Sequence, residues 1–285
     1  MTSQQLMSFA IEALPGLSDK VQFDVGELNK IGHPSPLRQE AIEGLLRRRC
    51  RVPDAWRYVV EVRQGQVKLK PASAGRGQRL RLSTYPDVSA RHRNRTLPVI
   101  ALLLESPHKD EYRHHCRRKR LIPNGPAQGV GTGDAGGAIL EYGPSILEQL
   151  VALKELVDDD YALLVVNPVP YLTSLHWLDV LTGYATQPQG GLNYDVRNHV
   201  WNQLWALQWM QADFLARLAS YAPSAVLNCC TLALRQAVTC ALCRGGYSSI
   251  SAFATHPAVT WQTGKPGGKG QPAKVQHLPC ESCTC

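Results

Sequence analysis

Residues 97–111 read LPVIALLLESPHKDE, an apolar run that passes directly into polar and charged residues. An uninterrupted run rich in Val, Ile and Leu is typical of a strand that is buried on both faces, as in a parallel sheet. Two further apolar runs follow at residues 161–166 and 225–228, and longer helical patterns separate the three. This alternation predicts an α/β fold with a parallel-sheet core and crossover helices.

Sequence patterns predict the start of one crossover helix and the buried face of another. Ser145 and Glu148 have the spacing of a capping box, which predicts a helix that begins at Ser145 and buries the apolar residues that follow. A second helix is expected at residues 197–219. Tryptophans recur at every fourth position of it: Trp201, Trp205 and Trp209. Such a stripe is more typical of a core-facing helix than of a platform for base stacking.

The sequence before residue 96 reads differently and predicts an N-terminal α+β extension. Short helical patterns cover residues 4–14 and 36–46, and alternating runs at 58–62 and 66–70 meet at Gln64-Gly65 like a hairpin. The expected organisation is an extension at 1–95 that ends in a basic loop, an α/β core at 96–262, and a tail at 263–285. That tail is rich in Gly, Pro and Lys and contains cysteines.

The charge balance favours a polyanionic partner. The chain has 285 residues, with 31 Lys and Arg against 23 Asp and Glu, and the cations cluster at residues 47–51, 76–95 and 113–120. Solvated loops explain the first two clusters equally well. No apolar run approaches the roughly 18 residues of a membrane span, and the N-terminus lacks the pattern of a signal peptide. A cytoplasmic protein with reduced thiols and no membrane partner is therefore expected.

Chemically useful side chains follow the predicted strands. Glu105 follows the first strand, Asn167 follows the second, and the third leads through a helix to His256. Because functional groups in open α/β sheets gather outside the carboxyl ends of the strands, we expect these three to share one pocket.

These segments resemble the iron-sulfur-type uracil-DNA glycosylases. Glu105, Ser106, Pro107 and Glu111 match the first motif of that family in register. Asn167 resembles its base-reading Asn, and His256-Pro257 resembles the His-Pro-Ser motif near the end of its domain. The motifs stand in the family's order and span residues 97–261. The resemblance implies a three-layer α/β/α core of uracil-DNA glycosylase type and a monofunctional DNA glycosylase that leaves an abasic site.

The resemblance also implies roles for these residues. Glu105 would orient a water and oppose the positive charge of the sugar, His256 would donate to O2 of the base, and Asn167 would read the base edge. Glu111 is a second candidate for water activation. Further residues expected to line the base pocket are Ser106, Pro107 and His108. Residues expected to contact DNA are Lys109, Arg113, Arg117, Arg118, Lys119, Arg120, Ser145 and Thr260.

Each member of the proposed trio also has a structural explanation. A Glu at a strand end can cap a helix, an Asn there often satisfies the backbone, and a lone His is usually structural. Ala258 stands where the family has a phosphate-contacting Ser, so Thr260 or the arginines would have to take its place.

The cysteines depart from the family. The four cluster cysteines are not in place, so no iron-sulfur cluster and no other cofactor is expected. Cys240, Cys243, Cys280 and Cys283 do have the paired spacing of a zinc site. The alternative is that these are buried helix cysteines and a loose tail.

A glycine-rich stretch points to the substrate. Residues 125–137 contain no aromatic residue where family members stack a ring on uracil, which predicts an enlarged pocket for a modified pyrimidine flipped out of DNA. Some superfamily members remove glucosylated hydroxymethylcytosine from phage DNA, and this chain looks closer to such members than to a housekeeping repair enzyme. A monomer acting on DNA is expected, with phage DNA as one candidate. Two alternatives stay open: ordinary uracil excision in base excision repair, and a nucleic-acid-binding module without turnover. Lyase activity also stays open, with Lys109 as the nearest lysine.

Overall fold

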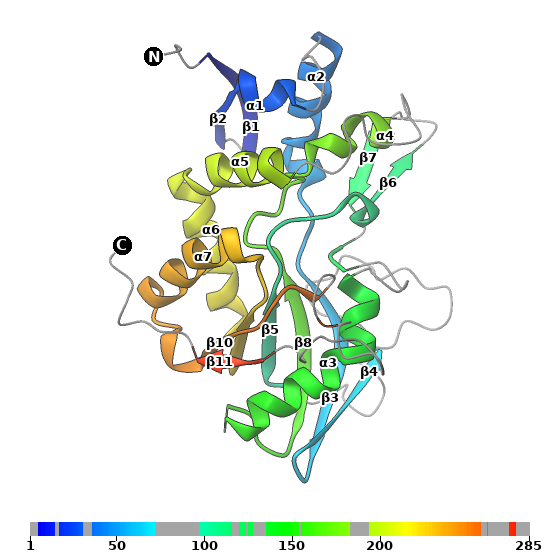
Figure 1. Ribbon diagram of the computed structural model, residues 1–285, viewed down its shortest axis with the longest axis vertical. Coiled ribbons are helices and arrows are strands. Elements are labelled where there is room, and N and C mark those ends of the chain that lie inside the picture. The colour runs from blue at the N-terminus through cyan, green and yellow to red at the C-terminus, as the bar shows by residue number, and fades with distance from the viewer. Residues whose placement is uncertain are drawn as a thin grey trace. The chain divides into compact units, whose positions relative to one another are not determined.

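The structure, a computed structural model, forms two compact units, each assembled from three segments of the chain (Figure 1). The sheet unit comprises residues 54–105, 125–167 and 215–285, and the N-terminal unit comprises residues 1–53, 106–124 and 168–214. The residues that the structure describes are 5–14, 17–30, 36–71, 97–115, 120–123, 125–127, 135–153, 155–182, 194–257, 261 and 274–277.

The sheet unit is built around a seven-stranded sheet in the order β11-β10-β9-β5-β8-β3-β4. The strands are β3 (Ala55–Arg63), β4 (Gln66–Pro71), β5 (Val99–Leu103), β8 (Asp160–Val166), β9 (Ala225–Asn228), β10 (Ser251–Phe253) and β11 (Gln276–His277). The consecutive strands β10, β9, β5 and β8 are parallel, whereas β11, β3 and β4 are antiparallel to their neighbours. The predicted α/β class is confirmed, but the sheet is mixed and the prediction of a parallel one is wrong.

The hairpin β3–β4 explains the difference. Gln64 and Gly65 both have positive φ, 52° and 79°, as a two-residue turn with the twist of the flanking strands requires, so the predicted hairpin is confirmed. β3 then pairs antiparallel with β8, with Ala55 opposite Val165. The hairpin thus extends the main sheet. The alternating pattern of its two strands predicts a hairpin but does not indicate which sheet the hairpin joins.

Strand β5 lies in the middle of the sheet and is buried on both faces. Ile100 and Leu102 belong to one hydrophobic core together with Ile139 of the helix α3 (Ala135–Ala152). The alternate residues Ala101 and Leu103 point to the other face and are also buried. Burial on both faces explains why this strand has a continuous apolar run instead of an alternating one.

Helix α3 begins at Ala135, before the predicted start at Ser145, so the predicted capping box is wrong. Ser145 lies inside the helix, where its Oγ donates to the carbonyl of Tyr142 at 2.9 Å. The Ser145 hydroxyl therefore bonds back to the preceding turn of its own helix and does not cap the start of a helix. Gly143 lets the helix approach β4, since a Cβ there would lie 2.9 Å from Leu69 Cδ1.

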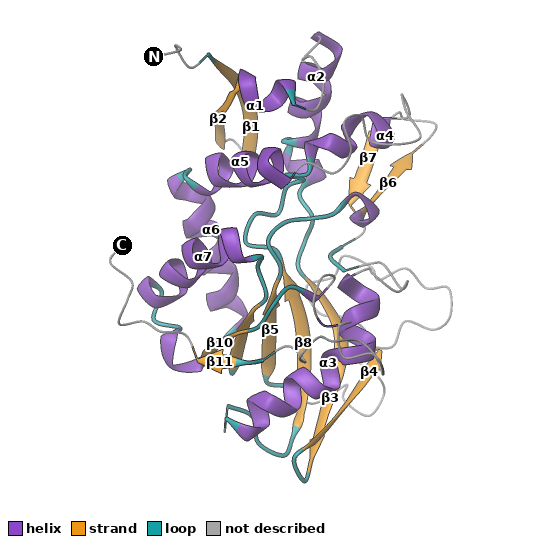
Figure 2. Cartoon of the chain, viewed as in Figure 1, coloured by secondary structure: helices purple, strands orange, loops and turns teal. Residues whose placement is uncertain are grey.

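The remaining helices of the sheet unit are α7 (Leu232–Arg244), the 3-10 turn η5 (Ser248–Ile250) and the C-terminal part of α6 (Gln208–Tyr221). Figure 2 shows the helices of this unit beside its strands.

The N-terminal unit combines short helices with two small antiparallel sheets. Its strands are β1 (Leu6–Leu14), β2 (Leu17–Asp24), β6 (Tyr112–His115) and β7 (Arg120–Pro123). Its helices are α1 (Val25–Asn29), α2 (Pro36–Leu45), α4 (Leu178–Thr182), α5 (Tyr194–Trp205) and the part of α6 up to Phe214, with 3-10 turns η1 (Arg48–Cys50), η2 (Lys109–Glu111) and η4 (Leu175–Trp177). Helix α2 confirms the prediction at 36–46.

The predicted helix at residues 4–14 is wrong, because this segment is strand β1. Phe9 and Ile11 are fully buried while Ser8 and Ala10 between them are not, which is the two-residue period of a strand. Phe9 packs on Phe23 of the paired strand β2 with ring centroids 5.1 Å apart. Pairing with β2 thus overrides a composition that suits a helix.

The predicted tryptophan-rich helix is two helices, α5 and α6, separated at Ala206 and Leu207. Trp201 and Trp205 are buried and stacked with centroids 5.0 Å apart, as expected for a core-facing stripe. Trp209 lies beyond the break and donates its indole N–H to Asp19 at 3.0 Å.

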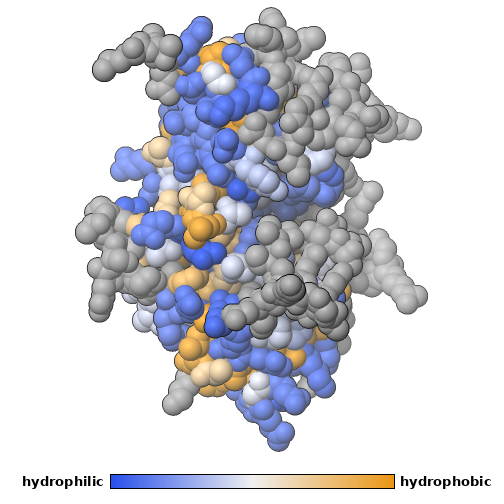
Figure 3. Space-filling view, in the orientation of Figure 1, coloured by the Kyte–Doolittle hydropathy of each residue, from blue (hydrophilic) through white to orange (hydrophobic). Residues whose placement is uncertain are grey.

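In the part of the chain that the structure describes, no helix has the length and apolar character that a membrane crossing needs. The face drawn in Figure 3 carries both hydrophilic and apolar residues. Large apolar side chains that are exposed come from separate elements, such as Leu6 in β1 and Leu232 in α7, and single residues of this kind are ordinary at a protein surface.

Candidate functional site

The parallel strands of the sheet unit end at one edge of the sheet. Leu103 at the end of β5 lies opposite both Val166 of β8 and Asn228 of β9, and Asn228 lies opposite Phe253 of β10. The ladder continues one residue further, because Leu104 N–H donates to the carbonyl of Val166 at 2.9 Å. Glu105, Asn167 and His256 each follow within three residues of such a strand end, so the sheet brings them to the same edge.

Glu105 is almost completely buried, with 5% of its surface exposed. Its Oε2 accepts the backbone N–H of Thr231 at 2.8 Å. Thr231 is the N-cap of helix α7 and makes no side-chain capping bond of its own. Glu105 therefore serves the start of α7 as a cap, which is the structural role that such a residue often has, and the helix dipole favours its negative charge.

This contact is also compatible with a chemical role. A carboxylate has two oxygens and about four acceptor sites, and the contact with Thr231 uses one of them. Holding one oxygen fixes the direction of the other. The arrangement supplies a buried, oriented anion at the carboxyl edge of the sheet.

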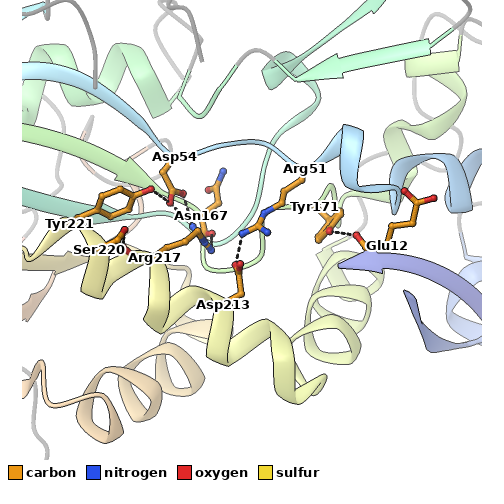
Figure 4. Close-up of polar contacts among 9 residues, drawn as sticks. All are labelled: Glu12, Arg51, Asp54, Asn167, Tyr171, Asp213, Arg217, Ser220 and Tyr221. Carbon is orange, nitrogen blue, oxygen red and sulfur yellow. Dashed lines mark hydrogen bonds and ion pairs between the residues drawn. The ribbon is translucent and has the colours of Figure 1, made fainter. Parts of the chain in front are cut away.

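Asn167 is 1% exposed and follows β8 directly. Its main-chain carbonyl accepts the Nη2 of Arg217 at 3.0 Å (Figure 4). Arg217 in turn binds Asp54, so the residue after the strand is attached to two other segments of the same unit. A buried amide on an anchored backbone can present both a donor and an acceptor.

His256 is half-buried and lies at the end of a short segment that leaves β10. Its neighbour Thr255 offers its main-chain carbonyl to the indole N–H of Trp261 at 2.8 Å, and Trp261 is buried in the main core. The hydroxyl of Thr255 is buried and finds no hydrogen-bond partner among the described residues. A buried hydroxyl of this kind is ordinarily satisfied by bound water or by a ligand.

A second buried Asn at this edge has a purely structural arrangement. Asn228 at the end of β9 is fully buried, and its Oδ1 accepts the N–H of Cys230 at 3.1 Å. Its Nδ2 donates at 3.3 Å to the carbonyl of Arg235 and to the hydroxyl of Thr239, both in α7. These bonds use the amide to join strand and helix, so Asn228 is not a candidate for ligand binding.

The other residues of the first motif belong to the N-terminal unit, because the division between units falls between Glu105 and Ser106. Ser106 lies with its Oγ 2.7 Å from the hydroxyl of Thr173. Pro107 is buried, and Glu111 is 4% exposed at the end of η2, where its N–H donates to the carbonyl of His108. Glu105 and Glu111, expected in one pocket, thus belong to different units.

His108 and Lys109 surround an aromatic residue that was not among the expected site residues. The ammonium of Lys109 lies 4.7 Å from the ring centroid of Trp177, and the ring of His108 meets Trp177 edge-on at 6.0 Å. Both side chains also contact the carboxylate of Asp110. Partial burial raises the pKa of Asp110, but the bond from Lys109 and the charges of His108 and Lys109 outweigh it and lower that pKa below its ordinary value. The pair His176-Trp177, which follows Asn167 by nine and ten positions, was the available signal.

His176 is 5% exposed beside Trp177. Burial lowers its pKa to about 4, and the charges of His108 and Arg197 act in the same direction. The imidazole is therefore neutral near pH 7. Its Nδ1 is buried and has no hydrogen-bond partner among the described residues.

Most of the expected DNA contacts lie beyond what the structure describes. Arg113 and Arg120 lie in β6 and β7 with undescribed side chains, and Arg117, Arg118, Lys119 and Thr260 lie outside the described residues, as do residues 76–95. Ser145 is exposed on α3.

The arginines of the basic cluster at residues 47–51 differ in their surroundings. Arg47, Arg48 and Arg49 are exposed. Arg51 instead makes an ion pair with Asp213, with 2.5 Å between Nη2 and Oδ2, so its charge is used within the N-terminal unit.

Of the described cysteines, Cys50, Cys229 and Cys230 are free thiols, as expected from the sequence, whereas two others are not. Cys240 and Cys243 in α7 are disulfide-bonded, so their sulfurs are not the thiolates that zinc binds. Cys280 and Cys283, the other half of the zinc candidate, lie outside the described residues. Among the described residues, no group of three or more His, Cys, Asp or Glu side chains has the arrangement of a metal site.

The glycine-rich stretch is described at its two ends, 125–127 and 135–137. The second end forms the first turn of α3, and in the first end Ala127 has a positive φ of 52°. The carbonyl of Ala127 accepts Nη2 of Arg57 from β3 at 2.5 Å. The structure does not describe the middle of this stretch, so the enlarged pocket stays a prediction.

Comparison with family models, with curated proteins and with solved structures finds no match to this chain.

Proposed function

We propose that this chain is a monofunctional DNA glycosylase of the uracil-DNA glycosylase superfamily, with a core of that type. One observation carries the proposal: a buried carboxylate, a buried amide and an imidazole follow the carboxyl ends of β5, β8 and β10 at one edge of a sheet. These are the residue types that the resemblance assigns to catalysis. Their position is where open α/β sheets collect functional groups.

The proposed reaction is hydrolysis of the bond between C1′ of the sugar and the base nitrogen. As this bond breaks, its electron pair leaves with the base and the sugar becomes cationic. Glu105 opposes that charge and orients the water whose oxygen bonds to C1′. His256 donates toward O2 of the departing base, and the proton lost by the water balances the one that the free base gains. The products are an abasic site and the free base.

Asn167 is proposed to select the base. Its amide donates and accepts, so it can read a pyrimidine edge once the nucleotide has flipped out of the helix. The burial of Asn167 increases the selectivity for the base, because a wrong base would leave a buried polar group without its hydrogen-bond partner.

The proposed substrate is a modified pyrimidine larger than uracil. This choice of substrate rests on the absence of an aromatic residue from residues 125–137. Glucosylated hydroxymethylcytosine in phage DNA is therefore a candidate substrate. On this proposal the enzyme acts as a cytoplasmic monomer in defence against phage.

A second candidate function is a nucleic-acid-binding module without turnover. The contact of Glu105 with the start of α7 favours it, because that contact gives the carboxylate a structural reason to be present. The two candidates differ in one outcome, the formation of abasic sites.

The test is to incubate the protein with plain DNA, uracil-containing DNA and DNA with glucosylated hydroxymethylcytosine, and to measure alkali-labile sites. We expect cleavage after alkali with the glucosylated DNA and little with plain DNA. Preference for uracil would select ordinary base excision repair. Absence of cleavage in all three, together with DNA binding, would select the binding module.

The matched variants are Glu105→Gln and Glu105→Ala. Gln keeps an oxygen that can accept from Thr231 but removes the anion, whereas Ala removes both. We expect Gln to lower single-turnover base release about 100-fold or more with little loss of DNA affinity. Unchanged release by Glu105→Gln would show that Glu105 only caps α7.

A further inference from the structure

Three side chains of the sheet unit converge on the residue that follows β8. Arg217 donates Nη1 to both carboxylate oxygens of Asp54 at 2.6 Å, and its Nη2 donates to the main-chain carbonyl of Asn167 at 3.0 Å (Figure 4). Tyr221, one turn later in α6, donates its hydroxyl to Oδ2 of Asp54 at 2.9 Å. One guanidinium therefore joins a carboxylate before β3, a carbonyl after β8, and the helix α6.

The topology of the sheet explains why these residues meet. β3 runs antiparallel to β8, and Ala55 at its start lies opposite Val165 near the end of β8. Asp54 therefore lies at the edge of the sheet where Asn167 begins. The Asp54 side chain is 1% exposed and that of Arg217 is 15% exposed. A charge buried to this degree needs a partner held in good geometry, and removal of one partner is costly.

We propose that Arg217 is a positioning residue for Asn167, acting through the carbonyl of Asn167 and anchored by Asp54 and Tyr221. The inference rests on the function proposed above and adds to it the residue that holds the base-reading amide in place. A planar guanidinium can serve two acceptors with different nitrogens, whereas an ammonium is a single point charge. The bridge therefore requires Arg and not merely a cation.

An ordinary structural ion pair in the same chain provides the matched control. Arg51 and Asp213 are also within hydrogen-bond distance and similarly buried, with side chains 17% and 12% exposed (Figure 4). Neither residue belongs to the candidate site. Changes at Arg51 therefore report what the loss of a half-buried ion pair does to folding alone.

The experiment compares Arg217→Lys and Arg217→Met with Arg51→Lys and Arg51→Met in the full chain. The measurements are the single-turnover rate of base release, the Kd for substrate DNA and the melting temperature. We expect Arg217→Met to lower the rate about 10- to 100-fold with Kd changed less than about twofold, since small misplacement of a reacting group costs rates of this size. Arg217→Lys should recover the melting temperature but not the rate. The Arg51 variants should change the melting temperature only.

Recovery of both rate and melting temperature by Arg217→Lys would overturn the inference, as would equal rates in the Arg217→Met and Arg51→Met variants. A parent protein that releases no base would overturn the proposed function instead. In that case hydrogen exchange of residues 160–171 decides the inference. Faster exchange in Arg217→Lys, with no change in Arg51→Lys, supports positioning, and unchanged exchange in both overturns it.

Discussion

His176 gives the N-terminal unit a specific dependence on pH. In the folded chain its pKa is lowered to about 4 by burial, helped by the charges of His108 and Arg197, while in the unfolded chain it returns to about 6.5. Above that value both states are neutral and the residue adds no pH dependence. Between pH 6.5 and 4 only the unfolded state binds the proton, so the free energy of unfolding falls as the pH falls.

We therefore expect the parent to lose about 3 kcal/mol more stability between about pH 7 and pH 4 than the variant His176→Gln. Gln stays neutral and polar, and the acid titration of all other groups is common to both proteins. Urea unfolding at a series of pH values measures the difference. Two parallel curves of stability against pH would show that His176 is accessible to protons in the folded protein.

At the candidate site, the sequence predicted where the residues lie in the sheet, and their roles stay proposals. Glu105, Asn167 and His256 could be placed at one sheet edge because strand ends are local features of the sequence. The contact of Glu105 with Thr231 and that of Arg217 with Asn167 could not be predicted, because they join residues far apart in the chain. No local pattern specifies a partner of that kind.

At the scale of elements, the turn between β3 and β4 contains a glycine whose backbone conformation, and not its surroundings, disfavours a side chain. Gly65 has φ 79° there, and a Cβ added to it would meet no atom within 4 Å. Gly44 near the end of α2 also has open space around an added Cβ, and its φ is not in the left-handed region. The two glycines thus differ mainly in backbone angle.

We expect Gly65→Ala to destabilise the protein by about 1 kcal/mol, because an L-residue is strained at positive φ. Gly44→Ala should stabilise it by roughly 0.5 kcal/mol, since Ala favours a helix and restricts the unfolded chain. The midpoints of urea unfolding for the two variants test this pair. The same sign of change for both would contradict the assigned turn.

The elements show which sequence signals are reliable. The apolar runs of β5, β8 and β9 and the turn at Gln64-Gly65 were predicted correctly, because burial on two faces and positive φ restrict sequence strongly. Strand β1 was predicted as a helix, because its apolar residues fit both periods and pairing with β2 decides between them. The capping-box pattern at Ser145 failed because the helix already begins at Ala135.

At the scale of the whole molecule, the proposed function predicts that the net charge of +8 makes binding to DNA dependent on salt. Replacing Arg117, Arg118, Lys119 and Arg120 by Gln should weaken binding to every DNA sequence alike. The slope of log Kd against log salt should become less steep by about 3.6, because each of the four phosphates that these cations would neutralise adds about 0.9 to it. Titrations at several salt concentrations measure that slope.

The control for this prediction changes the net charge equally at other exposed positions: Lys30, Arg63, Lys68 and Lys70. We expect Gln at these four positions to leave the salt slope nearly unchanged. Equal slopes for both quadruple variants would mean that net charge alone governs binding.

The order of strands also determines when the sheet can be completed as the chain leaves the ribosome. Strand β5 lies between β8 and β9, and Ile100 pairs with Ala225. One edge of the most apolar strand therefore waits for its partner until most of the chain has been synthesised. Contacts between residues so distant in sequence form slowly, and an unpaired apolar edge invites pairing with other chains. We therefore expect this sheet to be prone to intermolecular pairing at β5 until β9 has been synthesised.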